Sequence, residues 1–345
     1  MVMAAVLALP AGTAVAGGPA DAPQAAAITP GPAPAVTVLS YNVKGLPWPV
    51  AHHRGLAADE IAAALRAMRT DGDAPQVVAV QEAFGPAQQR IGALAGYPYS
   101  VFGPDRALAG PPPATPQQHR FVTHDRFWRG EGMGKFADSG LAVFSSYPVL
   151  WVKRLSYGDA CAGWDCMANK GALAVALSLP GVAQPLVVVD THLNAERAAH
   201  SGQHRSFAAY RRQLDLLSRF VGGIAPDAGA IVLTGDFNIG HDGTRGASLD
   251  NALFAADGLR LAATEKVCGR ACRAAADAPG EAGTVVPADA LVRTKSLIAY
   301  RDVAPGLLAP AGHVVTFGTR PDGHMLSDHV GIAMQFALTP SATRS

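Results

Sequence analysis

The sequence carries little net charge of either sign. Charged side chains make up 16% of its 345 residues, and 28 Lys and Arg against 27 Asp and Glu leave a formal net charge of +1. A protein that binds nucleic acid through bulk charge is usually far more basic, so binding here would have to depend on local charge or on a metal. The near balance therefore makes a nucleic acid the less favoured partner.

The chain also lacks an apolar run long enough to cross a bilayer. Residues 1–16 are apolar and small, but this stretch is too short for a membrane span. Ala14-Val15-Ala16 fits the small-residue pattern before a signal-peptidase cut, although no Lys or Arg stands at the front. We interpret residues 1–16 as a signal peptide, which predicts a soluble, secreted mature protein. A disordered Ala-rich tail is the alternative.

Only four cysteines are present, in two local pairs, Cys161/Cys166 and Cys268/Cys272. An even number of cysteines in an exported chain favours two disulfides that each close a small loop. A zinc site built from the two pairs is the alternative, although the pairs lie far apart and no nearby His completes a finger pattern.

The pattern of apolar residues predicts one α/β catalytic domain over residues 36–338. Residues 17–35 are rich in Gly, Pro and Ala and are interpreted as a flexible lead-in, and residues 339–345 as a tail. Apolar runs such as 36–42 and 77–80 are typical of strands, and the two clear helical stripes lie between strands. We therefore expect sheets covered by helices.

Polar side chains stand at or beside the ends of these strands. They are Asn42, Glu82, Asp190, His192, Asn194, Asp236, Asn238, Asp328 and His329. Side chains at strand ends can converge on one rim of a sheet, where folds of this class place their sites. Each has an ordinary explanation as a turn, cap or core residue. These residues fall into five groups, one at each of five strand ends. Five groups at the same structural position together favour one common site.

The residue types suit hydrolysis of a phosphodiester with a divalent cation. Mg²⁺ prefers oxygen ligands, and Glu82, Asp236 and the amide oxygen of Asn42 can supply them. His192 and His329 can donate hydrogen bonds and carry protons near neutral pH. A metal, an amide and an imidazolium together would stabilise the charge that builds on a phosphoryl group under attack.

The order of five segments resembles a known family. Residues 39–43, 80–82, 190–194, 234–238 and 327–329 read LSYNV, VQE, DTHLN, TGDFN and SDH. This set resembles the motifs of the endonuclease/exonuclease/phosphatase superfamily, and the resemblance extends from about residue 36 to residue 336. It implies a four-layer α/β sandwich, with two mixed sheets face to face and helices outside.

The resemblance also implies a metal site. Mg²⁺ would lie at Glu82 with Asn42 close by, and Asp236, Asn238 and His329 would complete its surroundings. Mn²⁺, Co²⁺ and Ca²⁺ are the alternative ions.

Catalytic roles follow from the same resemblance. His329, oriented or tuned by acidic neighbours, would be the base for the attacking water. Asp328 beside it need not touch it, and one of the two would reach the ligand while the other orients a nearby group. Asp236 and Asn238 would position water and a phosphoryl oxygen. His192 would stabilise the phosphoryl group or protonate the leaving group.

Within the superfamily, residues 138–149, 169–171 and 191–196 resemble bacterial neutral sphingomyelinases. This implies a sphingomyelin phosphodiesterase that releases phosphocholine and ceramide, with Asp138 as a further site residue; a turn before a strand is the ordinary explanation for Asp138. We expect a monomer that acts on a phospholipid or another phosphodiester and contacts the membrane surface transiently. The family's Leu-Asp-Tyr segment has only a loose counterpart here, with Asp289 in the place of its aspartate.

Two alternatives stay open at this point. An extracellular nuclease of the same fold would place basic side chains such as Arg126, Arg129 and Lys135 on the rim. A non-catalytic surface-binding protein that kept the fold is the other, although the retention of every catalytic residue type argues against it.

Overall fold

The computed structural model of the protein describes residues 34–47, 50–240, 243–265, 291, 294–304 and 306–339. All elements below belong to the unit Pro34–Ser345. The predicted signal peptide lies outside the described residues, as do Cys268, Cys272 and Asp289.

Two mixed six-stranded sheets form the centre of the fold, in the orders β11-β12-β1-β2-β4-β3 and β5-β6-β7-β8-β10-β9. The first contains β1 (Ala35–Asn42), β2 (Val77–Gln81), β3 (Tyr99–Phe102), β4 (Ala142–Ser145), β11 (Leu308–Phe317) and β12 (Gly331–Leu338). The second contains β5 (Val149–Ser156), β6 (Gly171–Leu177), β7 (Leu186–His192), β8 (Ala230–Asp236), β9 (Arg260–Thr264) and β10 (Ser296–Asp302). Each sheet has one parallel pair, β1 with β2 and β7 with β8.

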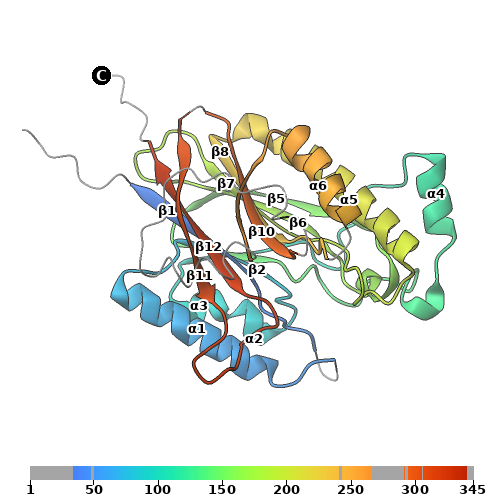
Figure 1. Ribbon diagram of the computed structural model, residues 1–345, viewed down its shortest axis with the longest axis horizontal. Coiled ribbons are helices and arrows are strands. Elements are labelled where there is room, and N and C mark those ends of the chain that lie inside the picture. The colour runs from blue at the N-terminus through green and yellow to red at the C-terminus, as the bar shows by residue number, and fades with distance from the viewer. Residues whose placement is uncertain are drawn as a thin grey trace, which may run out of the picture. The chain divides into compact units, whose positions relative to one another are not determined.

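Helices cover the outer faces of both sheets (Figure 1). The first sheet is covered by α1 (Arg54–Asp71), α2 (Pro86–Gln89) and α3 (Ile91–Ala95). The second is covered by α5 (Gln203–Ile224), α6 (Gly243–Leu249) and the π-helical turn η4 (Asp250–Ala255), with the short 3₁₀ turn η3 (Ala225–Asp227) after α5. This arrangement confirms the predicted four-layer sandwich.

Three apolar layers hold the sandwich together. Successive side chains of a strand point to opposite faces, so Val38 packs between the sheets while Leu39 packs against the helices of the first sheet. In the second sheet, Val188 faces the other sheet and Val189 faces α5. Strands buried on both faces need continuous apolar runs, which is the pattern of the sequence. Among the described helices, none combines the length and apolar character that crossing a bilayer requires.

The segment 103–137 has few paired apolar residues and a run of three prolines, Pro111 to Pro113, yet it contains a helix and a turn. Thr115 accepts a hydrogen bond from the backbone N–H of Gln118 at 3.2 Å, and Pro116 follows it, so α4 (Pro116–Thr123) has an ordinary capped start. The 3₁₀ turn η1 (Phe127–Arg129) comes next. Beside it lies the 3₁₀ turn η2 (Gly163–Met167), whose Cys166 forms a disulfide with Cys161 just before the turn, as expected for that pair.

A glycine near the end of β8 gives a direct test of the packing between the two parallel strands of the second sheet. Gly235 has a φ of 144°, and a Cβ built on it would lie 2.0 Å from the carbonyl oxygen of Thr191. We predict that Gly235→Ala lowers the free energy of unfolding by about 3 kcal/mol or more, because the backbone of β7 cannot move away. Gly222→Ala, in α5 with nothing within 4 Å of its Cβ, is the control and should stabilise by about 0.5–1 kcal/mol. Urea unfolding measures both, and equal stability of the two variants would contradict this account.

Candidate active site

The topology brings the polar strand ends together at one edge of both sheets. The parallel strands β1 and β2 end side by side, with Asn42 opposite Gln81, and β7 and β8 end with His192 opposite Asp236. β12 runs antiparallel to β1, so β12 begins at the edge where β1 ends, and the segment that precedes β12 reaches that edge. There Ser327 Oγ donates to the carbonyl oxygen of Asn42 at 2.7 Å.

One amide joins two carboxylates from different sheets at this edge. Asn42 Nδ2 donates to Glu82 Oε1 at 2.9 Å and to Asp236 Oδ2 at 3.0 Å. Its Oδ1 accepts from the backbone N–H of Lys44 at 2.9 Å, which fixes the orientation of the amide. The Asn42 oxygen that the sequence analysis expects to face a metal is therefore engaged with the backbone. Asn42 holds the two carboxylates through its nitrogen instead.

Two histidines flank Asp236. Its Oδ2 lies 3.7 Å from Nε2 of His192 and 3.7 Å from Nε2 of His329, and all three side chains are buried. Glu82, His192 and Asp236 each offer a ligand atom, and these atoms lie within 4.8 Å of one another. Residues separated by more than 240 positions in the sequence thus meet in one cluster, which we call the carboxylate–imidazole cluster: Asn42, Glu82, His192, Asp236 and His329.

A lysine in the segment 169–171, to which the sequence analysis assigns no role in the site, also reaches the cluster. Lys170 Nζ lies 3.1 Å from His192 Nε2 and 2.8 Å from Asp165 Oδ2, and Asp165 Oδ2 also accepts from the backbone N–H of Ala195 at 2.5 Å. Lys170 stands just before β6, which is antiparallel to β7, so the start of β6 lies at the same edge as the end of β7. Extending the strand-end rule to residues that precede antiparallel strands would have found it.

Burial and neighbouring charges set the ionisation of the cluster. Burial lowers the pKa of His192 to about 3, helped by the Lys170 ammonium, so this imidazole is neutral at pH 7. Burial opposes ionisation of Asp236, yet His329, His192, the Asn42 amide and Lys170 hold its pKa at about 2. Burial also raises the pKa of Glu82.

Two residues at this edge of the sheets, one in the cluster and one beside it, adopt a left-handed backbone conformation that residues other than glycine rarely take. Glu82 has a φ of 58° and Asn238 a φ of 46°. Asn tolerates the left-handed region, but a Glu there is uncommon, and such strain concentrates at functional sites. Each of these residues comes just after a strand, and the left-handed turn directs the chain sharply away from the sheet there.

The remaining predicted site residues lie around the cluster. Asn238 Nδ2 donates to the carbonyl oxygen of Leu193 at 3.0 Å. The Asp328 carboxylate lies at the surface, 3.2 Å from Lys44 Nζ. Asp138 is exposed and accepts from the backbone N–H of Arg106 at 2.8 Å. None of these three contacts places the side chain inside the cluster.

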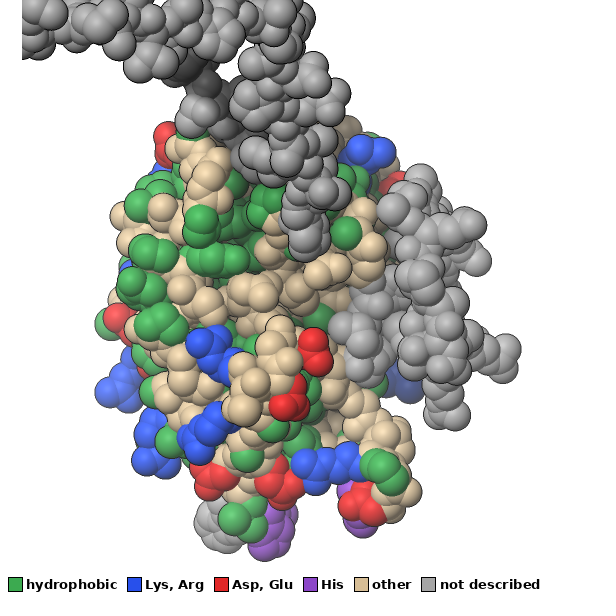
Figure 2. Space-filling view, turned by 90° about the vertical axis from the view of Figure 1, so that its left-hand side faces the viewer, with side chains coloured by type: hydrophobic (Ala, Val, Ile, Leu, Met, Phe, Trp, Pro, Cys, Tyr) green, Lys and Arg blue, Asp and Glu red, His purple; other side chains and the backbone are tan. Residues whose placement is uncertain are grey.

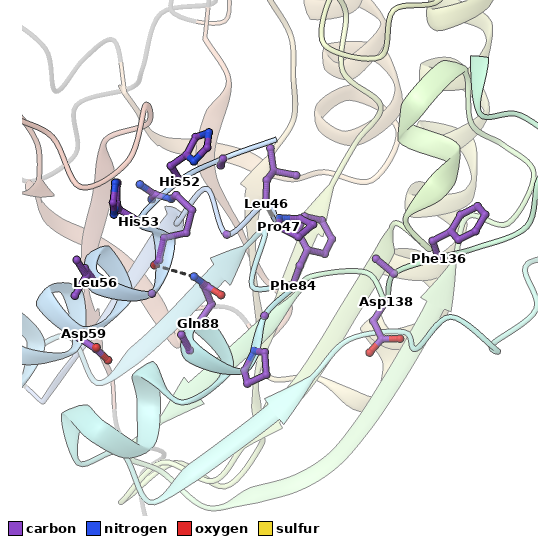
Figure 3. A pocket seen from close by; sticks show the side chains of 18 of the residues that line it. Leu46, Pro47, His52, His53, Leu56, Asp59, Phe84, Gln88, Phe136 and Asp138 are labelled. Carbon is purple, nitrogen blue, oxygen red and sulfur yellow. Dashed lines mark hydrogen bonds between the residues drawn. The ribbon is translucent and has the colours of Figure 1, made fainter. Parts of the chain in front are cut away.

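A cavity of about 1030 Å³ is lined by residues that follow the strand ends of the first sheet, and none of the five cluster residues lines it. Gly45 and Phe84 line it, a few residues after Asn42 and Glu82, and a Cβ on Gly45 would lie 2.2 Å from the Glu82 carbonyl oxygen. Figure 3 shows Phe136 and Asp138 at one end of the cavity and His52 and His53 at the other, with Phe84 between them.

The donor set fits a divalent cation. Glu82 Oε2 is buried and has no hydrogen-bond partner among the described residues, while Oε1 is held by Asn42. Asp236 adds a second carboxylate beside it. Buried carboxylates facing each other need a compensating charge, and oxygen atoms of this kind are the ligands that Mg²⁺ prefers.

Comparison with known families gives one match over most of the chain. The family model described as the Endonuclease/Exonuclease/phosphatase family matches residues 39–329. A search among curated protein sequences finds no match.

Several solved structures share the fold at low sequence identity. Sphingomyelinase C from Streptomyces griseocarneus has a TM-score of 0.58 at 19% identity, covering 88% of this chain and 99% of that one. A beta toxin variant from Staphylococcus aureus with bound magnesium ions has a TM-score of 0.58 at 16% identity, covering 87% and 98%. D. rerio TDP2 complexed with a single-strand DNA product has a TM-score of 0.54 at 16% identity, covering 88% and 98%. These likenesses show the fold.

The neutral state of His192 predicts a pH dependence of stability. Its pKa is about 3 in the folded protein and about 6.5 in the unfolded chain, so below pH 6.5 only the unfolded chain takes up this proton. Its contribution to the free energy of unfolding therefore falls by about 1.4 kcal/mol for each pH unit between pH 6 and pH 4. We predict that His192→Gln removes this slope, measured as the difference from wild type by urea unfolding with a chelator present. Parallel stability curves for the two proteins would contradict the neutral, buried state of His192.

Proposed function

Because the chain belongs to the endonuclease/exonuclease/phosphatase family, we propose that it is a secreted, Mg²⁺-dependent phosphodiesterase that hydrolyses sphingomyelin to phosphocholine and ceramide. The observation that carries the proposal is the carboxylate–imidazole cluster, in which Glu82 and Asp236 meet two buried histidines. The likeness to sphingomyelinase C supports the choice of lipid.

Glu82 and Asp236 are the residues that would hold the cation, with Asn42 fixing their separation. A bound Mg²⁺ would supply positive charge beside the phosphoryl oxygens. The beta toxin structure with bound magnesium ions supports this choice of metal.

His329 is positioned to act as the base. Its Nε2 faces Asp236, whereas its Nδ1 is buried away from the cluster without a hydrogen-bond partner in the described part of the chain. A water beside Nε2 would lose its proton to that atom, and the ionised Asp236 carboxylate 3.7 Å away would stabilise the resulting imidazolium.

Lys170 and His192 form the opposite side of the cluster. The Lys170 ammonium donates to His192 Nε2, which keeps that imidazole neutral and adds a positive charge close to Asp236. A phosphoryl group at the cluster would meet this charge as its own negative charge builds. Asp165 holds Lys170 in place from the outer side.

The cavity beside the cluster supports a substrate with a cationic headgroup. Phe84 and Phe136 supply aromatic side chains and Asp138 a carboxylate, which are the groups that recognise quaternary ammonium ions (Figure 3). Gly45 of the cavity lining lies against the backbone carbonyl of Glu82, so we place the phosphate of a phosphocholine ester at the cluster and its choline toward Asp138.

A nuclease receives less support from the surface charges. Lys135 turns inward, where its Nζ donates to the carbonyl oxygen of Gly158 at 2.9 Å, so it does not line a basic rim. On the face in Figure 2, which lies opposite α4, basic and acidic side chains are interspersed rather than gathered into a field of one sign. The disulfide between Cys161 and Cys166 supports a location in an oxidising compartment, as expected after secretion.

Two substitutions test the metal site and the base. We predict that Glu82→Gln abolishes the rise in melting temperature on adding Mg²⁺, because the substitution removes the unpartnered carboxylate oxygen that would bind the cation. Glu60→Gln, at a surface ion pair with Arg320, should respond to Mg²⁺ like wild type.

His329→Ala should lower kcat by about 10²–10⁴-fold. His324→Ala, an exposed histidine of the same segment, is the control, and full turnover by the His329 variant would defeat the mechanism.

A substrate panel tests the choice of lipid. With Mg²⁺, the protein should release phosphocholine from sphingomyelin and cut plasmid DNA weakly or not at all. Asp138→Asn should raise KM for choline phosphodiesters while affecting hydrolysis of bis(p-nitrophenyl) phosphate much less, because that substrate lacks the cation. DNA cleavage alone would establish the nuclease instead, and Mg²⁺ binding without turnover of any substrate would establish a binding protein.

A further inference from the structure

Four aromatic side chains lie exposed on η1, η2 and the loop between residues 130 and 137. Trp128 is 92% exposed, Phe136 56%, Phe127 53% and Trp164 52%. Large aromatic side chains are ordinarily buried, yet Phe127 and Trp128 contact each other edge to face, with ring centroids 5.6 Å apart, outside the core. We call these four residues the aromatic rim.

The backbone beneath the aromatic rim is held firmly. The buried Glu131 carboxylate accepts from the backbone N–H of Gly163 at 2.8 Å and pairs with Arg205 of α5 at 2.7 Å. Phe136 N donates to the carbonyl oxygen of Met167 at 2.7 Å. These bonds join the loop to η2 and to the body of the protein, so the exposure of the rings is a feature of the fold.

The aromatic rim borders the candidate active site. Trp164 is followed by Asp165, whose carboxylate binds Lys170, and Lys170 contacts His192 in the cluster. Phe136 also lines the cavity beside Asp138. In Figure 1, the segment that carries α4 stands out beyond α5, so this part of the chain projects from the sandwich.

Exposed guanidinium groups accompany the rings. Arg120, Arg126 and Arg129 lie on the same segment, and Arg129 Nη1 donates to the carbonyl oxygen of His200 at 2.9 Å. Aromatic side chains with guanidinium groups beside them match the interface of a bilayer, where acyl chains meet phosphates.

We propose that the aromatic rim is a docking element that inserts into the headgroup region of a phosphocholine bilayer and sets the cavity against it. The inference rests on the proposed function only in that the substrate is a lipid presented at a surface. A second protein fits less well, because the four rings expose roughly 500 Å², below the about 800 Å² per partner of a stable interface. A nucleic acid would need a continuous basic groove, which the half-buried, inward-turned Lys135 and the acidic Asp125 interrupt.

Vesicle binding tests the proposal without turnover. Full-length protein is mixed in EDTA with phosphatidylcholine vesicles that contain no sphingomyelin, and binding is measured by cosedimentation and by quenching of Trp fluorescence with brominated lipid. Wild type should bind and be quenched, and Phe127→Ala/Trp128→Ala should bind at least about tenfold more weakly. Leu150→Ala, which removes a 56% exposed side chain of β5, should bind like wild type. Trp128→Phe should retain most binding, which separates lost insertion from lost folding.

Each outcome decides the proposal. Equal binding by wild type and the double variant, or no binding by wild type, overturns it. Binding of a single-stranded DNA oligonucleotide through Trp128 with no vesicle binding also overturns it and makes the rim a base-stacking surface. Vesicle binding through the rim without phosphodiesterase activity would support docking and defeat the proposed function. Hydrolysis of detergent-dispersed sphingomyelin without vesicle binding would do the reverse.

Discussion

The bridge from Asn42 to Glu82 and Asp236 is the interaction on which the rest of the structure depends. It joins carboxylates that come from two different sheets, so it requires both sheets to end at the same edge. Two carboxylates in a low-dielectric site repel each other, and one amide cannot neutralise them. The Lys170 ammonium offsets part of that charge, and the unpartnered oxygen of Glu82 leaves a position where a cation completes the balance.

Three features of different polarity follow one another from this bridge toward the solvent. The cluster is buried and polar, the neighbouring cavity is lined by aromatic and charged side chains, and the aromatic rim is exposed. Phe136 belongs to both the cavity and the rim, and Asp165 connects η2 to the cluster through Lys170. A choline phosphodiester lipid has one group for each feature, with its phosphate lying between an apolar anchor and a cationic headgroup. In the proposal the phosphate lies at the cluster, the headgroup lies in the cavity and the anchor stays in the bilayer that the aromatic rim contacts.

Much of the fold could be predicted from the sequence because the central strands are buried on both faces. The first four residues of β7 and of β8 are all apolar, and the polar residues that end both strands mark the edge of the sheet. The half-exposed strand β5 was not predicted, because it mixes Trp151 and Leu155 with Lys153 and Arg154 and lies at the edge of its sheet.

The details of the site could be predicted only in part. Residue types and strand ends indicate Glu82, Asp236, His192 and His329, but the orientation of the Asn42 amide depends on the backbone N–H of Lys44. The left-handed conformation of Glu82 and the approach of Lys170 depend on contacts between distant segments, which no local pattern encodes. One measurement tests the central claim most directly: the anomalous difference map of a crystal soaked in Mn²⁺. The account predicts a peak bound by the carboxylates of Glu82 and Asp236. A map without density there, or with the ion bound only elsewhere, would contradict it.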